Sequence, residues 1–163
     1  MALSTQPTPF VPAVTWKGQP VAWVARSPSG VAMLSFKQPA LQLRLHSGTT
    51  DAGSLGWRYG PVIAGLERKR LVAAFNGGFR LSVGVGVGGF ESFGPTAAPL
   101  GNGLGSVVTY IDGTTDIGSW HHEVPASGRT VASVRQNLPL LIDHGTAGST
   151  LNCVSCWGAT LGG

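Results

Sequence analysis

Charged residues are scarce in this sequence. They make up 11% of the 163 residues, against about 25% in an average soluble domain. Such a low charge content argues against a disordered chain, a coiled coil or a nucleic-acid-binding tail. No apolar run reaches the roughly 18 residues that a transmembrane helix needs, so the sequence predicts no membrane span. The first seven residues also lack the basic segment and the apolar stretch of a signal peptide.

Cysteine is nearly absent. Cys153 and Cys156 have C-x-x-C spacing, but a zinc site needs a second pair of ligands and the chain has no other cysteine. The four histidines are not spaced to supply that pair. The sequence therefore predicts no metal site and identifies no cofactor. The cysteine pair indicates either a local disulfide of an exported protein or two ordinary thiols.

The net charge of +4 predicts only a mild attraction to anions. The densest basic stretch, Arg68 to Arg70, directly precedes an apolar run and is typical of a solvated segment leading into a buried strand. No aromatic residues alternate with these basic residues, as they do in proteins that bind single-stranded nucleic acid. The sequence therefore predicts no nucleic-acid partner.

Glycine and proline are abundant, with 25 and 11 residues, and they leave little room for long helices. We therefore expect an α+β fold, dominated by antiparallel strands with one or two short helices, in a single domain. Four prolines between residues 1 and 20 predict an extended N-terminal segment. Residues 21–163 contain no repeat and no linker that would divide them.

Periodicity and turn residues predict the individual elements. The expected strands are Val21–Arg26, Val31–Phe36, Leu41–Leu45, Leu71–Phe75, Ser106–Ile111, Thr114–Trp120 and Leu138–Ile142. Asp112-Gly113 gives the strongest hairpin signal because this dipeptide tolerates positive φ. A short helix is expected within Pro61–Arg70, a helical turn over Val131–Asn137, and a long loop or loosely paired ribbon over Gly84–Gly105.

Three features carry candidate chemistry. Asn76 and two following glycines come after an apolar run, where glycine permits close backbone approach. The Asn76 amide would then either bind a polar ligand or cap its own turn. Asp143 ends an apolar strand, and Glu91 would enter a site only if its glycine-rich loop folds over it. Gly84–Gly89 formally fits G-x-G-x-x-G, but no helix follows it, so it predicts a loop and not a dinucleotide site.

Several blocks occur in an order that resembles the phosphodiester glycosidase family, and its actinobacterial branch in particular. The resemblance covers roughly residues 21–163. The blocks are Leu71–Phe79, Gly88–Phe90, Ser106–Gly113, Asp116–Trp120, Val134–Asp143 and Trp157–Gly162.

The resemblance implies hydrolysis of a sugar 1-phosphodiester outside the cytoplasm, at the cell envelope or beyond it. Asn76, Arg135 and Asp143 are the implied catalytic residues: Asn76 orients the sugar or phosphate, the Arg135 fork meets phosphate oxygens, and Asp143 is the acid/base. The implied substrate-binding residues are Gly77, Gly78, Gln136 and Asn137, with Glu91 added from its loop.

This resemblance has a departure. Family members continue beyond the Trp-Gly-Ala-Thr-Leu-Gly block, so the chain is expected to be a C-terminally truncated fragment. An alternative function is a non-catalytic carbohydrate-binding or envelope-associated domain, in which the same residues hold a glycan without cleaving it. The enzymatic interpretation requires two segments to lie next to each other in space: the Asn76 turn, residues 76–78, and the Arg135 segment, residues 135–137.

Overall fold

A computed structural model describes residues 7–53, 55–81 and 88–153, which group into two compact units. The described part of residues 1–42, together with Arg70–Ala74, forms the first unit. The second unit contains the rest of the described chain, from Leu43 to Lys69 and onward from Phe75.

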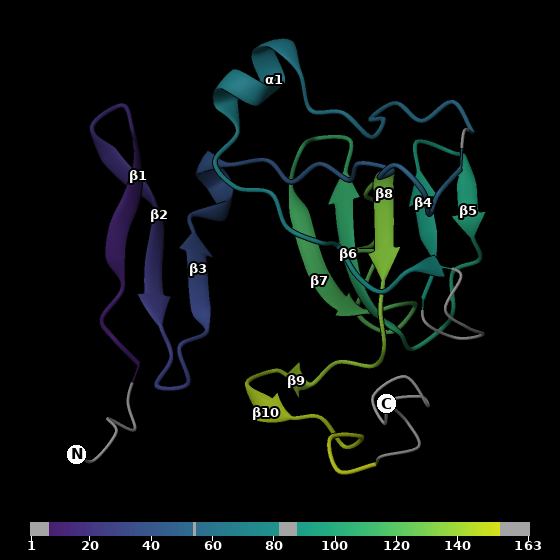
Figure 1. Cartoon of the computed structure of the whole chain (residues 1–163). Helices are drawn as coiled ribbons and strands as arrows, with labels where there is room; N and C mark the ends of the chain where they lie inside the picture. Colours follow the sequence, from purple (N-terminus) through teal and green to yellow (C-terminus); the bar gives the residue numbers. More distant parts are fainter. Residues whose placement is uncertain (1–6, 54, 82–87, 154–163) are drawn as a thin grey trace. The chain divides into compact units, whose positions relative to one another are not determined.

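The first unit is a three-stranded antiparallel sheet with the order β1-β2-β3 (Figure 1). Its strands are β1 (Val11–Trp16), β2 (Gln19–Arg26) and β3 (Ala32–Phe36). The strands predicted over Val21–Arg26 and Val31–Phe36 correspond to β2 and β3, which pair with each other. Gly30, with φ of 84°, closes their connecting turn. β1 lies within the segment predicted to be extended, and it pairs with β2 along its length.

The second unit is built on a five-stranded antiparallel sheet with the order β5-β4-β8-β6-β7 (Figure 1). Its strands are β4 (Phe90–Ser92), β5 (Thr96–Ala98), β6 (Gly105–Tyr110), β7 (Thr115–Ser119) and β8 (Val131–Gln136). The predicted β6–β7 hairpin is confirmed, with Gly113 at φ of 85°. Hydrogen bonds from Thr114 and Arg129 lower the pKa of Asp112, in the same turn, to about 2.

The helical turn predicted over residues 131–137 is wrong, because most of this segment is β8, the central strand of the sheet. Elements cover both faces of a central strand, so its residues are buried in succession and do not alternate between apolar and polar. Ala132, Val134 and Gln136 on one face, and Ser133 and Arg135 on the other, are all buried. Because residues on both faces of β8 are buried, its sequence lacks the alternation of apolar and polar residues that predicts a strand.

The two faces of the five-stranded sheet carry different residues. One face packs a cluster of Val108, Tyr110, Trp120, Val124 and Val134. On the opposite face a row of cross-strand partners runs from Phe90 through Arg135 and Val107 to Ile117. Arg135 therefore projects from the centre of a sheet, on the face away from the apolar cluster.

The expected α+β class is wrong, because the described residues form a mainly β structure. They contain three antiparallel sheets, one six-residue α-helix and one 3₁₀ turn. The helix α1 (Gly65–Arg70) buries no residue, so packing adds little to its stability. The remaining elements are the turn η1 (Gln38–Ala40) and a small sheet of β9 (Ile142–Asp143) and β10 (Thr146–Ala147).

Two predicted strands are not present. Residues 41–45 and 71–75 lie outside every strand, and Leu71 and Phe75 are 46% and 66% exposed. A strand needs a neighbour for its backbone hydrogen bonds, and no strand in the described ranges pairs with either segment. The predicted strand over 138–142 is reduced to its last residue, where β9 begins. No helix among the described residues is long and apolar enough to cross a membrane.

Part of the sequence analysis falls outside the described residues. This applies to most of the G-x-G-x-x-G segment, to Cys156 and to the Trp157–Gly162 block.

Candidate functional site

The end of β8 holds the Asn76 turn. Asn137 follows β8 directly, and its Oδ1 accepts a hydrogen bond from the Phe79 N–H at 3.2 Å, across 58 residues of sequence. Its Nδ2 donates to the Gly77 carbonyl at 3.2 Å. The two sequence segments on which the enzymatic interpretation depends therefore meet. Arg135, Gln136 and Asn137 together are called the β8 clamp below.

Arg135 is the charged residue of this clamp, and it is buried, with 7% of its surface exposed. Its Nη1 donates to the Gly89 carbonyl at 3.2 Å and to the Gln136 carbonyl at 2.7 Å. Its Nη2 donates to the Phe79 carbonyl. Burial lowers the pKa of Arg135, and the negative charge of Asp51 opposes this shift. Three of the five guanidinium N–H groups thus donate to backbone carbonyls and hold the surrounding segments in place.

Gln136 is fully buried, and both ends of its amide are used within the fold. Oε1 accepts from the N–H groups of Gly89 at 3.2 Å and Gly101 at 2.8 Å. Nε2 donates to the Gly101 carbonyl at 3.1 Å and to Ser106 Oγ at 3.0 Å. An amide with this many partners has no group left for a substrate. Gln136, predicted to bind substrate, ties two loops to the sheet instead.

The Asn76 turn is packed closely against the clamp. Asn76 Oδ1 accepts a hydrogen bond from the Gly78 N–H at 3.2 Å, the self-capped turn that was the alternative interpretation. A Cβ at Gly78 would lie 2.9 Å from Arg135 Nη2 and 3.0 Å from Asn137 Cγ. Only glycine fits there without displacing the clamp. Asn76 and Gly77 themselves are exposed, so the turn presents its outer side to solvent.

Glu91 lies on the other face of the sheet. In the β4–β8 ladder, Phe90 pairs with Arg135 and Glu91 pairs with Val134. Successive residues of a strand point to opposite faces. The structure therefore does not bring Glu91 and the Arg135 guanidinium together.

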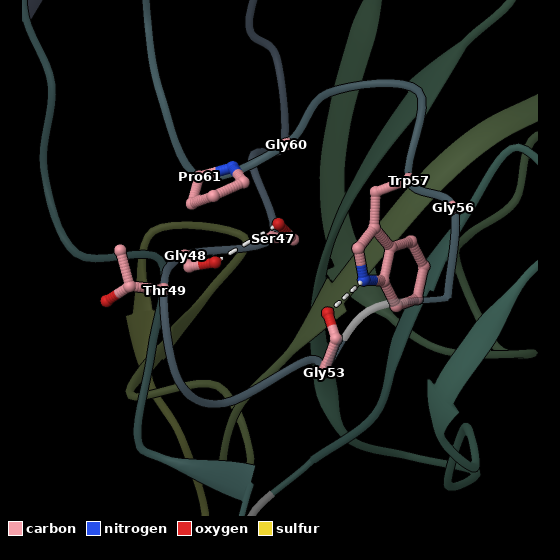
Figure 2. Close-up of a pocket in the computed structure, with 8 residues that line it drawn as sticks. All are labelled: Ser47, Gly48, Thr49, Gly53, Gly56, Trp57, Gly60 and Pro61. Carbon is pink, nitrogen blue, oxygen red and sulfur yellow. Dashed lines mark hydrogen bonds between the residues drawn. The ribbon is translucent and has the colours of Figure 1, made fainter.

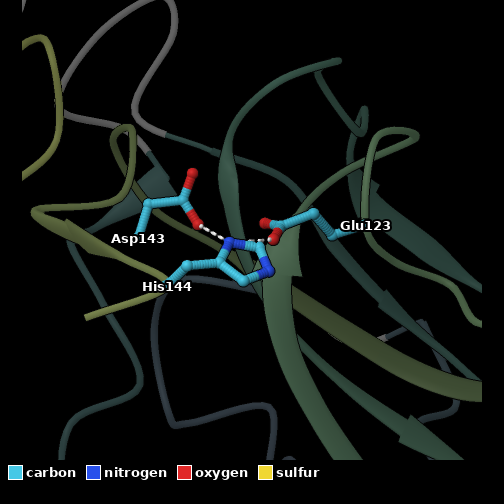
Figure 3. A group of neighbouring side chains, drawn as sticks. All are labelled: Glu123, Asp143 and His144. Carbon is cyan, nitrogen blue, oxygen red and sulfur yellow. Dashed lines mark hydrogen bonds and ion pairs between the residues drawn. The ribbon is translucent and has the colours of Figure 1, made fainter. Parts of the chain in front are cut away.

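Asp143 belongs to an exposed cluster with His144 and Glu123 (Figure 3). His144 Nδ1 lies 2.7 Å from Asp143 Oδ1 and 3.3 Å from Glu123 Oε1. These carboxylates raise the pKa of His144. Within the described chain, no hydrogen bond or ion pair joins Asp143 to Arg135 or Asn76. The carboxylate predicted to be the acid/base thus engages its neighbours on the surface.

Asp51 is a carboxylate close to the Asn76 turn that the sequence analysis did not select as a site residue. Its Oδ2 accepts a hydrogen bond from the Leu81 N–H at 2.6 Å, just beyond the Asn76 turn. Its charge also acts on the Arg135 guanidinium. Asp51 lies in a glycine- and serine-rich loop, and no local pattern distinguishes it from an ordinary loop residue. Only the tertiary fold brings it to the clamp.

The same loop forms an open groove with a volume of about 620 Å³ (Figure 2). Trp57 is its one aromatic lining residue; its Nε1 donates to the Gly53 carbonyl at 3.0 Å. The indole also packs edge-on against Phe90, with ring centroids 5.0 Å apart. Phe90 is the strand partner of Arg135, so the groove adjoins the sheet face from which Arg135 projects. The groove is lined by Ser47, Gly48, Thr49, Gly53, Gly56, Trp57, Gly60 and Pro61.

Comparisons with protein-family models, with curated proteins and with solved structures found no match to this chain. The resemblance to phosphodiester glycosidases therefore stays a prediction that rests on the sequence blocks.

Proposed function

We propose that this chain carries the site of a hydrolase that cleaves sugar 1-phosphodiesters. The observation that carries the proposal is the attachment of the exposed Asn76 turn to Arg135 and Asn137, with Asp51 alongside. An anion-binding guanidinium, an exposed amide and a carboxylate are the groups that such a reaction needs. The extracellular or envelope location expected from the resemblance belongs to the same proposal.

Each group receives a role from its position. The Arg135 guanidinium binds a phosphate oxygen, and the exposed Asn76 amide orients the sugar or the phosphate. Asn137 and Gln136 are positioning residues because their amides hold the surrounding loops. Asp51 replaces Asp143 as the proposed general base, and the groove beside Trp57 receives the sugar.

Hydrolysis of the diester requires only one carboxylate in this site, that of Asp51. Asp51 accepts a proton from water as the water oxygen bonds to the anomeric carbon. The bond between that carbon and the phosphate oxygen breaks, and the phosphate monoester leaves with the bonding electrons. Most glycosidases use a second carboxyl group to protonate the leaving oxygen. A phosphate monoester departs as a stable anion, so this second group is less necessary.

A second candidate is a non-catalytic carbohydrate-binding domain, and the groove favours it. An indole edged by hydroxyl and peptide groups is a common combination in ligand sites. A carbohydrate-binding domain would require only the groove and would not require Asp51 as a base.

Matched substitutions of the two aspartates test the proposal. With the methyl diester of glucose 1-phosphate as substrate, we expect Asp51→Asn to lower kcat by about 100-fold, the usual contribution of a general base. Asp143→Asn makes the same chemical change in the surface cluster and should leave kcat within about twofold of wild type, since it touches no proposed reacting group.

The reverse pattern, or an unchanged rate in Asp51→Asn, contradicts the assignment of Asp51. Binding of glucose with no turnover by the wild-type chain supports the carbohydrate-binding candidate instead. Circular dichroism of both variants checks that each is folded.

A further inference from the structure

We propose that the ligand of the groove is an acidic saccharide, whose carboxylate or phosphate, additional to the scissile phosphodiester, binds Arg58. This inference rests on the proposed function to the extent that the groove receives a sugar. The residues concerned form an arginine shelf, defined as Arg44, Arg58, Tyr59 and Phe93.

Arg58 is held by aromatic rings and has no acidic partner in the part of the chain that the structure describes. Its guanidinium carbon lies 4.4 Å from the centroid of the Phe93 ring and 5.9 Å from that of Tyr59. The two rings pack edge to face, with centroids 5.7 Å apart. No residue in the described ranges forms an ion pair with Arg58. Stacking engages the face of a guanidinium and leaves its in-plane N–H donors available for an anion.

Arg44 supports the shelf but is neutralised. Its guanidinium carbon lies 5.2 Å from the Tyr59 centroid, and its Nη1 contacts Glu67 Oε1 at 3.1 Å. His46 Nε2 contacts the same carboxylate oxygen at 3.2 Å. Because Glu67 already contacts Arg44 and His46, Arg58 is the arginine of the shelf without an acidic partner among the described residues.

One backbone hydrogen bond connects the shelf to the groove, because the Tyr59 carbonyl accepts from the Ser47 N–H at 3.1 Å and Ser47 lines the groove. Trp57 and Gly60, which flank Arg58 and Tyr59 in the sequence, also line it. A saccharide in the groove therefore has Arg58 on an adjoining residue of the same loop. One arginine suits a single acidic substituent, whereas a single-stranded nucleic acid needs a cationic track along its backbone.

Isothermal titration with defined probes tests this inference. The probes are trigalacturonate, a mannose trisaccharide carrying a 6-phosphate, and neutral galactotriose. We expect at least one acidic probe to bind about tenfold more tightly than galactotriose, and Arg58→Ala to remove that advantage, since a charge-assisted hydrogen bond is roughly twice as strong as a neutral one. Arg58→Lys keeps the charge but loses the planar fork and should recover only part of it.

Lys37→Ala is the matched control, because it removes one exposed positive charge from the other unit and should leave all three affinities unchanged. Equal affinity for acidic and neutral probes, no effect of Arg58→Ala, or tighter binding of oligothymidylate than of either acidic probe would overturn the inference. Arg58-dependent binding without hydrolysis of the glucose diester would reject the hydrolase alone. Hydrolysis without that binding would reject the shelf alone.

Discussion

Gln136→Leu is expected to lower the free energy of unfolding of the second unit by about 4 kcal/mol. The substitution keeps the side-chain volume approximately but leaves the Gly89 and Gly101 N–H groups and the Gly101 carbonyl without their partner, while the Ser106 hydroxyl keeps its bond to the Leu104 carbonyl. Each buried polar group left unpaired costs about 1–3 kcal/mol. Partial relaxation of the two loops toward water keeps the expected total below the largest sum of three such costs.

Urea denaturation followed by circular dichroism measures this loss. Gln42→Leu makes the same chemical change at an exposed position of the first unit, and it should change the stability by less than about 0.5 kcal/mol. If the two substitutions had equal effects, the loops at the end of β8 would not depend on the Gln136 amide, and the β8 clamp would be wrong.

Gly78→Ala is expected to lower kcat on the glucose diester by about 100-fold while costing only about 1–3 kcal/mol of stability. The added Cβ overlaps Asn137 Oδ1, the acceptor of the Phe79 N–H, and meets Arg135 Nη2 at 2.9 Å, so the Asn137 amide must move. A displacement of about 1 Å at the Asn76 turn is enough for this loss, because a reacting geometry tolerates little error.

Gly77→Ala is the matched neighbour. Its Cβ would meet Arg135 Cγ at 3.6 Å and Leu45 Cδ1 at 3.9 Å, which are ordinary contacts. We expect this variant to fold normally and to lose less than tenfold in kcat. Equal losses at both glycines would mean that the turn needs flexibility rather than close contact with the clamp.

Local signals predicted part of this structure. Asp112-Gly113 predicted the β6–β7 hairpin because that turn depends on two adjacent residues. The Asn76 and Arg135 segments were expected to meet on the strength of the family blocks, and Asn137 bonds them together.

Other features depend on contacts between distant residues. The sequence of β8 wrongly predicts a helical turn, because a strand buried on both faces shows no alternation of apolar and polar residues. Leu71–Phe75 was taken for a buried strand because it is apolar, but no neighbouring strand among the described residues pairs with it. Asp51 is not among the residues that the sequence selects, because only its hydrogen bond to the Leu81 amide and its charge near Arg135 distinguish it, and both depend on the fold.

Hydrolysis of the glucose diester in water enriched in ¹⁸O tests the central claim most directly. In the proposed mechanism the oxygen of water bonds to the anomeric carbon. Mass spectrometry should therefore find the label in the glucose that the wild-type chain releases. Asp51→Asn should release little labelled glucose. Label in the phosphate would mean that the phosphorus–oxygen bond is cleaved instead. That result, or a wild-type chain that releases no glucose at all, would contradict the account.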